Sequence, residues 1–272
     1  LILLGLVKKV VIADGVAVVA DRLFDDPAGV SSLAAVAGVL AFSIQIYGDF
    51  SGYTDIARGV SRLLGIELVV NFRQPYLSRN ITEFWRRWHI SLSDWLRDYL
   101  YIPLGGNRGG SLFTYRNLML TMLLGGLWHG ASWNFVWWGA LHGAYLIGHR
   151  LLRGGRVDDA PVRLAHVPSV AATFCVVSLT WIFFRAPDAE SSLAVFRALA
   201  VQSGATDVGH LVLVGALGTL TLLIDVVARR TELRSPSVPP TPLAAGATVG
   251  AALVALIVFS GATVRPFVYF QF

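Results

Sequence analysis

Hydrophobic runs of near-bilayer length recur along the chain and predict a series of membrane-spanning helices. The clearest runs cover residues 167–184, 208–228 and 243–262, with proline-containing polar segments between them. Residues 31–48 form a further apolar run. The apolar stretch 115–149 has glycines and an asparagine in its middle, so it predicts two short or broken helices. The pattern indicates an all-α fold, a polytopic transmembrane bundle that includes broken or re-entrant helices.

Two segments depart from this simple alternation. Residues 1–24 mix apolar positions with lysines and acids, which is typical of an interfacial or partly inserted helix. The run 31–48 ends at residues 48–55, where two glycines and two carboxylates interrupt the hydrophobic pattern. We therefore expect a helix break there. Because carboxylates facing lipid are costly, Asp49 and Asp55 are expected to face protein or water.

The segment after residue 80 combines arginines with aromatic side chains. Asn80 and Glu83 have the spacing of a capping box, and Pro103 provides a stop, so one helix from about 81 to 101 is expected. His89 falls on a stripe of aromatic and leucine side chains at spacings of three and four residues. Two interpretations stay open: a packing histidine in an interfacial helix, or part of a site.

His129 lies between small residues in the middle of an apolar stretch. An ionisable group at membrane depth is costly when charged, so His129 is a candidate functional residue facing a cavity or the bundle interior. The alternative is that it only hydrogen-bonds a neighbouring helix. His142 and His149 are better explained as packing or interfacial residues.

Composition excludes an ordinary soluble globule. The 272 residues are 55% hydrophobic and 14% charged, whereas soluble domains have about 25% charged residues. The net charge of +5 could suggest a nucleic-acid partner, but the basic residues lie in short clusters between apolar runs. They are expected to face lipid headgroups, so no nucleic acid is expected as a partner.

Charge in the loops predicts an orientation. The loops 150–165 and 229–242 are rich in arginine, whereas 185–207 has two arginines against three acids. Since basic loops are retained on the cytoplasmic side, the first two loops are expected there and the C-terminal end on the far side.

Several kinds of chemistry lack their sequence signature. No histidine pair has the i, i+4 spacing with a nearby acid, so no metal site is expected. There is no G-x-S-x-G elbow, phosphate loop or tandem repeat. Three classes remain: an enzyme, a transporter or flippase with intramembrane polar groups, and a noncatalytic membrane scaffold.

The chain contains six ordered motifs: QIYGDFSGYTD (45–55), NFRQPY (71–76), FWRRWHISL (84–92), YIPLGGN (101–107), GLWHG (126–130) and the ending YFQF (269–272). Through these motifs the chain resembles the membrane-bound O-acyltransferase superfamily, and within it the alginate O-acetyltransferase-like bacterial branch. Family members carry additional N-terminal spans, so residues 1–272 are expected to be a single transmembrane domain of this type that lacks them.

The resemblance implies acyl transfer inside the membrane, with His129 as the catalytic residue and His89 as its partner. A buried imidazole is expected to stay neutral, which is the form that a general base needs. Attack on a thioester creates an oxyanion that needs a donor. His89, Asn134 and a backbone N–H near Gly130 are the candidates, and spacing does not choose among them.

The resemblance also implies a donor, an acceptor side and a tunnel. Acetyl-CoA is expected as a cytoplasmic donor substrate, with no bound cofactor. A separate extracytoplasmic acetyltransferase and exopolysaccharide machinery are the expected partners in a bacterial cytoplasmic (inner) membrane. Gly126 is expected to be a small position in the wall of the narrow central tunnel. The expected tunnel-lining residues are Asp49, Ser51, Tyr53, Asp55, Trp85, Trp88, Trp128, Trp133 and Asn134.

Three arginines are candidates for binding the donor phosphates: Arg86, Arg87 and Arg97. An ordinary positive-inside anchor explains them equally well. For the polar residues 49–55, an equally open alternative is that they cap a helix break and touch no substrate.

Overall fold

The computed structural model describes residues 1–154, 163–200, 203–230, 241–261 and 266–267. The regular elements among these residues are helices, with a single isolated bridge between Val30 and Ala205, so the all-α prediction is confirmed. Four helices of the described part are long and apolar enough to cross a membrane, and they are Ser32–Leu63, Leu164–Arg185, Val208–Ala228 and Pro242–Phe259. The loop positions 155–162 and 231–240 and the 269–272 motif lie outside the described residues.

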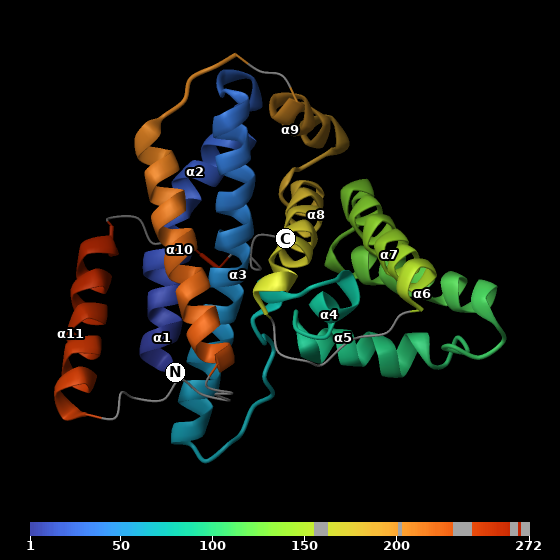
Figure 1. Cartoon of the computed structure of the whole chain (residues 1–272), viewed down its shortest axis with the longest axis horizontal. Helices are drawn as coiled ribbons and strands as arrows, with labels where there is room; N and C mark the ends of the chain where they lie inside the picture. Colours follow the sequence, from blue (N-terminus) through green and yellow to red (C-terminus); the bar gives the residue numbers. More distant parts are fainter. Residues whose placement is uncertain (155–162, 201–202, 231–240, 262–265, 268–272) are drawn as a thin grey trace. The chain divides into compact units, whose positions relative to one another are not determined.

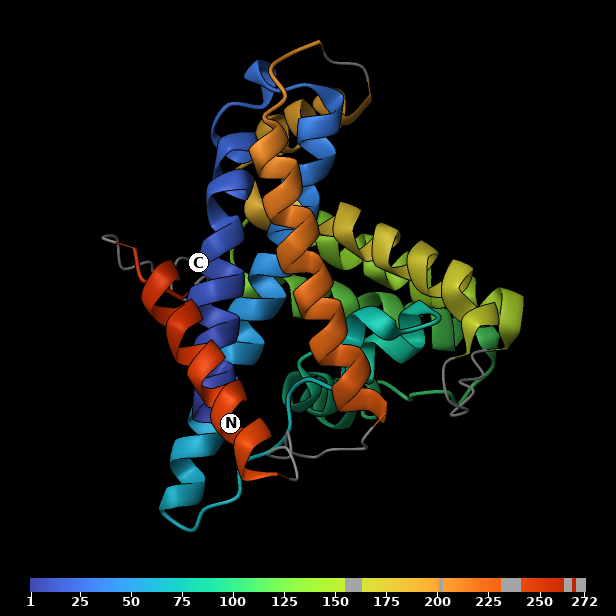
Figure 2. The ribbon, with the colours of Figure 1, turned by 60° about the vertical axis from the view of Figure 1, so that its left-hand side comes forward.

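The chain divides into two compact units, Leu1–Val70 with Arg197–Phe272 and Asn71–Phe196. The first unit contains a helical N-terminal run that packs along a long helix, α3 (Figures 1 and 2). Its helices are α1 (Ile2–Leu6), the π-helical stretch η1 (Val7–Ala13), α2 (Asp14–Asp25), the 3₁₀ turn η2 (Pro27–Gly29), α3 (Ser32–Leu63), α10 (Val208–Arg230) and α11 (Pro242–Phe259).

The predicted helix break at residues 48–55 is wrong, because α3 continues without interruption to Leu63. The glycines serve close packing against the N-terminal run instead. A Cβ atom on Gly52 would lie 2.8 Å from the carbonyl oxygen of Gly5, and one on Gly5 would lie 2.6 Å from that of Gly52. Small residues allow such an approach of two helix backbones. The interfacial placement of residues 1–24 stays a prediction.

The second unit holds the histidine motifs. Its short elements are the 3₁₀ turns η3 (Pro75–Leu77) and η5 (Leu164–His166), the helices α4 (Ile81–Trp85) and α5 (Ile90–Leu96), and the π-helical turn η4 (Arg97–Tyr101). Its longer helices are α6 (Ser111–His129), α7 (Trp133–Arg153) and α8 (Val167–Arg185), followed by α9 (Ala189–Ala200), whose residues from Arg197 onward are counted with the first unit. The prediction of two helices within 115–149 is confirmed, and the apolar runs from residue 167 onward fall on α8, α10 and α11.

Glycines set the close contact between α6 and α7. A Cβ atom on Gly126 would overlap the carbonyl oxygen of Phe135, and one on Gly139 would overlap that of Met122. The structure gives Gly126 a packing role, since the α7 backbone occupies the place of a side chain there, and its position in a tunnel wall stays a prediction. A leucine there would separate the two helices.

Because of this contact, substitution of two glycines of α7 should have different effects on stability. Gly139→Ala should destabilise the protein by about 1–3 kcal/mol, because the added methyl group overpacks the α6–α7 contact. A Cβ atom on Gly148 would meet nothing within 4 Å, so Gly148→Ala should be neutral or stabilise α7 by up to about 1 kcal/mol. Thermal unfolding in lipid nanodiscs compares them, and equal midpoints for both variants would contradict the packing role.

Candidate functional site

The helical conformation is interrupted just before and at His89. The prediction of one helix from 81 to 101 is wrong, because α4 ends at Trp85 and α5 begins only at Ile90. His89 adopts a left-handed conformation with φ 42° and ψ 57°. For a residue with a Cβ atom this conformation costs about 1–2 kcal/mol, and such strain persists where surrounding contacts enforce it.

Those contacts come from the segment that begins at Asn71. The carbonyl oxygen of Asn71 accepts a hydrogen bond from the Ile90 backbone N–H at 3.0 Å. Its side-chain oxygen accepts from the Ser91 backbone N–H at 3.2 Å and from the Ser91 hydroxyl at 2.6 Å. The backbone N–H of Arg73 donates to the Arg87 carbonyl at 3.0 Å. Asn71 thus holds the first turn of α5 next to the His89 bend.

His129 is the last residue of α6 and is surrounded by aromatic rings. Ring centroids lie 4.9 Å away at Trp128, 5.4 Å at Trp138 and 5.0 Å at Phe184. Gly130 ends the helix directly after it, so the imidazole sits at the α6–α7 connection. The walls of this site are therefore largely aromatic.

The structure places His89 and His129 in the same unit, although they are far apart in sequence. His89 lies within electrostatic range of His129. Burial lowers the pKa of His89 to about 4, which leaves it neutral at physiological pH. The pair has the chemistry expected of a base and a neutral hydrogen-bonding partner, and the role of each stays a prediction.

The four candidate tryptophans occupy different environments. Trp88 is 2% exposed and stacks on Phe84, with ring centroids 5.5 Å apart. Trp85 packs edge-on against Trp138. Trp128 and Trp133 are 60% and 75% exposed. Trp88 belongs to the interior of the second unit, Trp85 is half-buried, and the other two lie at its surface near the α6–α7 connection.

Asn134 links two helices. It is buried near the start of α7, and its Nδ2 donates to the carbonyl oxygen of Ala186, just after α8, at 2.8 Å. Ser132 caps the same helix end by accepting from the Asn134 backbone N–H. One amide hydrogen of Asn134 is therefore engaged within the protein.

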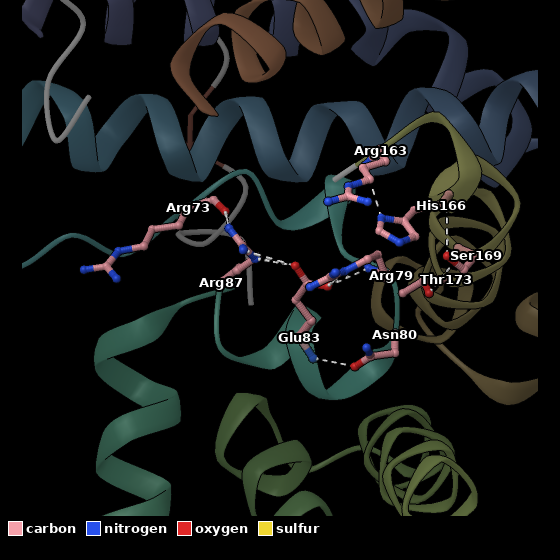
Figure 3. Close-up of polar contacts among 9 residues, drawn as sticks. All are labelled: Arg73, Arg79, Asn80, Glu83, Arg87, Arg163, His166, Ser169 and Thr173. Atoms are coloured by element: carbon pink, nitrogen blue, oxygen red, sulfur yellow. Dashed lines mark hydrogen bonds and ion pairs between the residues drawn. The ribbon is translucent and has the colours of Figure 1, made fainter. Parts of the chain in front are cut away.

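A buried carboxylate organises the arginines near α4 (Figure 3). Glu83 is 2% exposed and accepts hydrogen bonds from the backbone N–H and Nε of Arg79, each at 2.9 Å, and from Arg87 Nε at 3.1 Å. Asn80 accepts from the Glu83 backbone N–H at 2.8 Å. The predicted N-cap is thus confirmed. In a capping box the Glu83 side chain would accept from the Asn80 backbone N–H, but here it accepts from the backbone N–H of Arg79, one residue earlier.

These bonds also set the ionisation of Glu83. Burial alone would raise its pKa, but the hydrogen bonds from Arg79 and the charges of both arginines outweigh burial and leave the pKa below its usual value. Glu83 is therefore a charged anchor between α4 and the preceding loop.

The three candidate phosphate-binding arginines differ in their ion-pair and hydrogen-bond partners. Arg87 is held by Glu83, and its Nη1 donates to the Arg73 carbonyl at 3.0 Å. Arg97 is paired with Asp94 and with Asp98, each at 2.7 Å. Arg86 is exposed and has no ion-pair partner within the described residues. Of the three, Arg86 is the one whose guanidinium is available.

The polar residues of α3 lie in the first unit and pair with the N-terminal run. Asp49, 1% exposed, lies 2.7 Å from Lys9 Nζ, and Asp55 lies 2.7 Å from Lys8 Nζ. The expectation that both carboxylates face protein or water is confirmed. Ser51 is also buried, and Tyr53 packs edge-on against Phe267. Whether these four residues line a chamber stays a prediction.

Sequence reasoning missed a buried polar pair between α7 and α8. His142, on α7, is completely buried and lies 2.9 Å from the hydroxyl oxygen of Thr180 on α8, measured from Nε2. The i, i+4 spacing of Trp138 and His142 could have placed them on one face of a helix. Nothing in the sequence indicates Thr180 as the partner.

The chain has helices of membrane-spanning length, which define the class as a polytopic membrane protein. Its two motif histidines lie where helices begin or end, and imidazole groups can transfer protons. The chain belongs to the membrane-bound O-acyltransferase family, whose sequence profile matches residues 1–184.

Three curated relatives illustrate the similarity. The chain is 51% identical over 197 residues to the "Probable alginate O-acetylase AlgI" of Azotobacter vinelandii, covering 72% of this chain and 38% of that protein. It is 47% identical over 206 residues to the "Peptidoglycan O-acetyltransferase" of Helicobacter pylori, covering 74% and 38%. It is 35% identical over 129 residues to the "Teichoic acid D-alanyltransferase" of Streptococcus thermophilus, covering 44% and 30%. The chain thus spans less than half the length of these relatives.

Proposed function

We propose that the protein is a membrane-embedded O-acetyltransferase that moves an acetyl group from a cytoplasmic donor, acetyl-CoA, toward an extracytoplasmic polysaccharide or a partner acetyltransferase. The observation that supports this proposal is that His129 lies among aromatic rings at the α6–α7 connection, within electrostatic range of His89. Family membership supports the reaction class.

In the proposed reaction, His129 takes the proton from the attacking hydroxyl group while the hydroxyl oxygen bonds to the thioester carbonyl carbon. The tetrahedral intermediate then collapses, the carbon–sulfur bond breaks, and the imidazolium returns the proton to the leaving thiolate. An oxyanion donor is needed in between. The Gly130 backbone N–H and one Asn134 amide hydrogen already donate within the protein, which favours His89 for this role.

For the donor, we propose that Arg86 contacts the coenzyme A phosphates. Arg86→Gln should raise the KM for acetyl-CoA by about tenfold, because a charge-assisted bond to phosphate is lost. Arg97→Gln is the matched control and should change that KM by less than about twofold, because its exposed partners are Asp94 and Asp98. Steady-state kinetics with varied acetyl-CoA measures both, and equal effects would contradict the assignment.

For the acceptor, the names of the relatives mention alginate, peptidoglycan and teichoic acid. We infer an acceptor outside the cytoplasmic membrane, reached directly or through a separate extracytoplasmic acetyltransferase and the exopolysaccharide machinery. The acetyl group would pass through a narrow tunnel in a bacterial inner-membrane protein while coenzyme A stays in water, since its phosphates cannot enter hydrocarbon.

A transporter or flippase for a polysaccharide precursor or small anion is the alternative, because glycine-rich helices with buried polar groups also build substrate pathways. Radiolabelled acetyl-CoA separates the two. The whole protein in lipid should transfer label to protein, lipid or polysaccharide and release free coenzyme A. Intact acetyl-CoA together with movement of a labelled solute would favour the transporter.

A further inference from the structure

His142 lies in a box of aromatic rings in the second unit. Its side chain is completely buried, and ring centroids lie 5.1 Å away at Trp85, 4.8 Å at Trp138 and 6.4 Å at Trp181. These rings come from α4, α7 and α8, so the box joins three elements of one unit. The proposed reaction assigns no role to His142.

The hydrogen bonds of Thr180 fix the tautomer of this imidazole. The Thr180 hydroxyl donates its single hydrogen to the Val177 carbonyl oxygen at 2.7 Å. Its oxygen must then accept at its 2.9 Å contact with His142 Nε2. Nε2 therefore carries the hydrogen, and Nδ1 has a free lone pair that can only accept.

Within the described part of the chain, this Nδ1 has no hydrogen-bond partner, and neither have the buried indole N–H groups of Trp85, Trp138 and Trp181. The box thus holds one unpartnered acceptor and three unpartnered donors. Native proteins leave few buried polar groups unpaired, because desolvation without a new bond is costly. The complementary ligand is a group that donates once and also accepts.

A hydroxyl group has this pattern, whereas a carbonyl cannot donate to Nδ1 and an ammonium cannot accept from an indole. Trp138 contacts both histidines, with ring centroids 5.4 Å from His129 and 4.8 Å from His142. The box therefore adjoins the proposed base.

We propose that His142 Nδ1 accepts a hydrogen bond from a hydroxyl group bound in this aromatic box, beside His129. The hydroxyl belongs either to an ordered water molecule or to the acetyl acceptor. His142 is thus a positioning residue, and Thr180 holds it in the accepting tautomer. The role in acetyl transfer rests on the proposed function, whereas the hydroxyl site itself does not.

NMR of the whole protein in lipid nanodiscs, labelled with ¹⁵N-histidine, tests the site without any activity. We expect a His142 signal with protonated Nε2 and a hydrogen-bonded, unprotonated Nδ1. Thr180→Val should abolish this single tautomer. Thr173→Val, on the same helix, is the matched control, because Thr173 bonds only to the Ser169 carbonyl within the described residues. A protonated Nδ1, or an Nδ1 shift typical of a nitrogen without a hydrogen bond, would overturn the proposal.

Two further measurements identify the source of the hydroxyl. Methyl glucoside should shift the Nδ1 signal if a sugar hydroxyl occupies the site, whereas a cross-peak to water that the sugar leaves unchanged indicates ordered water. In the active protein, Thr180→Val should raise the acceptor KM, or lower kcat if water is bound, by about three- to tenfold. No change in tautomer or in either constant would contradict the positioning role.

Discussion

Replacing His129 by alanine is expected to reduce acetyl transfer by about 10²- to 10⁴-fold, equivalent to about 3–5.5 kcal/mol of activation free energy. The substitution removes the proposed base and adds no polar group to the apolar surroundings. Expression and membrane insertion should therefore be unaffected. Turnover of labelled acetyl-CoA by purified protein, compared at equal amounts of folded enzyme, gives the measurement.

His166→Ala is a useful control for this experiment. His166 belongs to the 3₁₀ turn before α8, where its Nδ1 accepts from the Arg163 backbone N–H at 3.1 Å, and the proposed reaction does not use it. Its turnover should stay close to that of the unaltered protein. The turnover of His89→Ala should lie between those of the His129→Ala and His166→Ala variants. Loss of a residue that only orients the base or polarises the substrate leaves residual activity. Substantial turnover by the His129 variant would refute the assignment of the base.

Replacing Glu83 by alanine is expected to destabilise the second unit by about 3–5 kcal/mol, because the change leaves the charges of Arg79 and Arg87 without their shared buried partner. Asp98→Asn provides the control, as that carboxylate is half exposed and pairs with Arg97 at the surface. It should leave the unfolding temperature almost unchanged, because exposed ion pairs contribute little to stability. Thermal unfolding in nanodiscs compares the two variants.

The pH dependence gives a second check on Glu83. Its pKa is lowered in the folded protein, so its contribution to stability is fully present above the unfolded pKa and is lost as the pH falls through the folded pKa. Glu83→Gln should flatten this acid loss. An unchanged acid profile together with an unchanged melting temperature would show that the carboxylate is not the anchor.

The sequence predicts features that depend on local pattern. Apolar length predicted α8, α10 and α11, the glycines near residue 130 predicted the division between α6 and α7, and Asn80 predicted the start of α4. Each depends on residues within a few positions of one another, which is the range over which helix length and capping act.

Features fixed by distant partners could not be predicted in the same way. His89 fits a continuous helical stripe, but hydrogen bonds from Asn71 hold its backbone in the left-handed region. Gly52 has the sequence pattern of a helix breaker, but its role is to let the backbone of Gly5 approach α3 closely. The tautomer of His142 depends on Thr180, from another helix. The histidine motifs indicated which residues to examine, while their surroundings required the fold.

Sealed, oriented vesicles test the central claim, that acetyl groups pass from a cytoplasmic donor to an acceptor on the opposite side. Radiolabelled acetyl-CoA is supplied only at the cytoplasmic face, with the polysaccharide acceptor and any partner acetyltransferase only at the other. The account predicts labelled acceptor on the extracytoplasmic side, free coenzyme A on the cytoplasmic side, and loss of both in the His129→Ala variant. Acetylated product confined to the cytoplasmic side would contradict it.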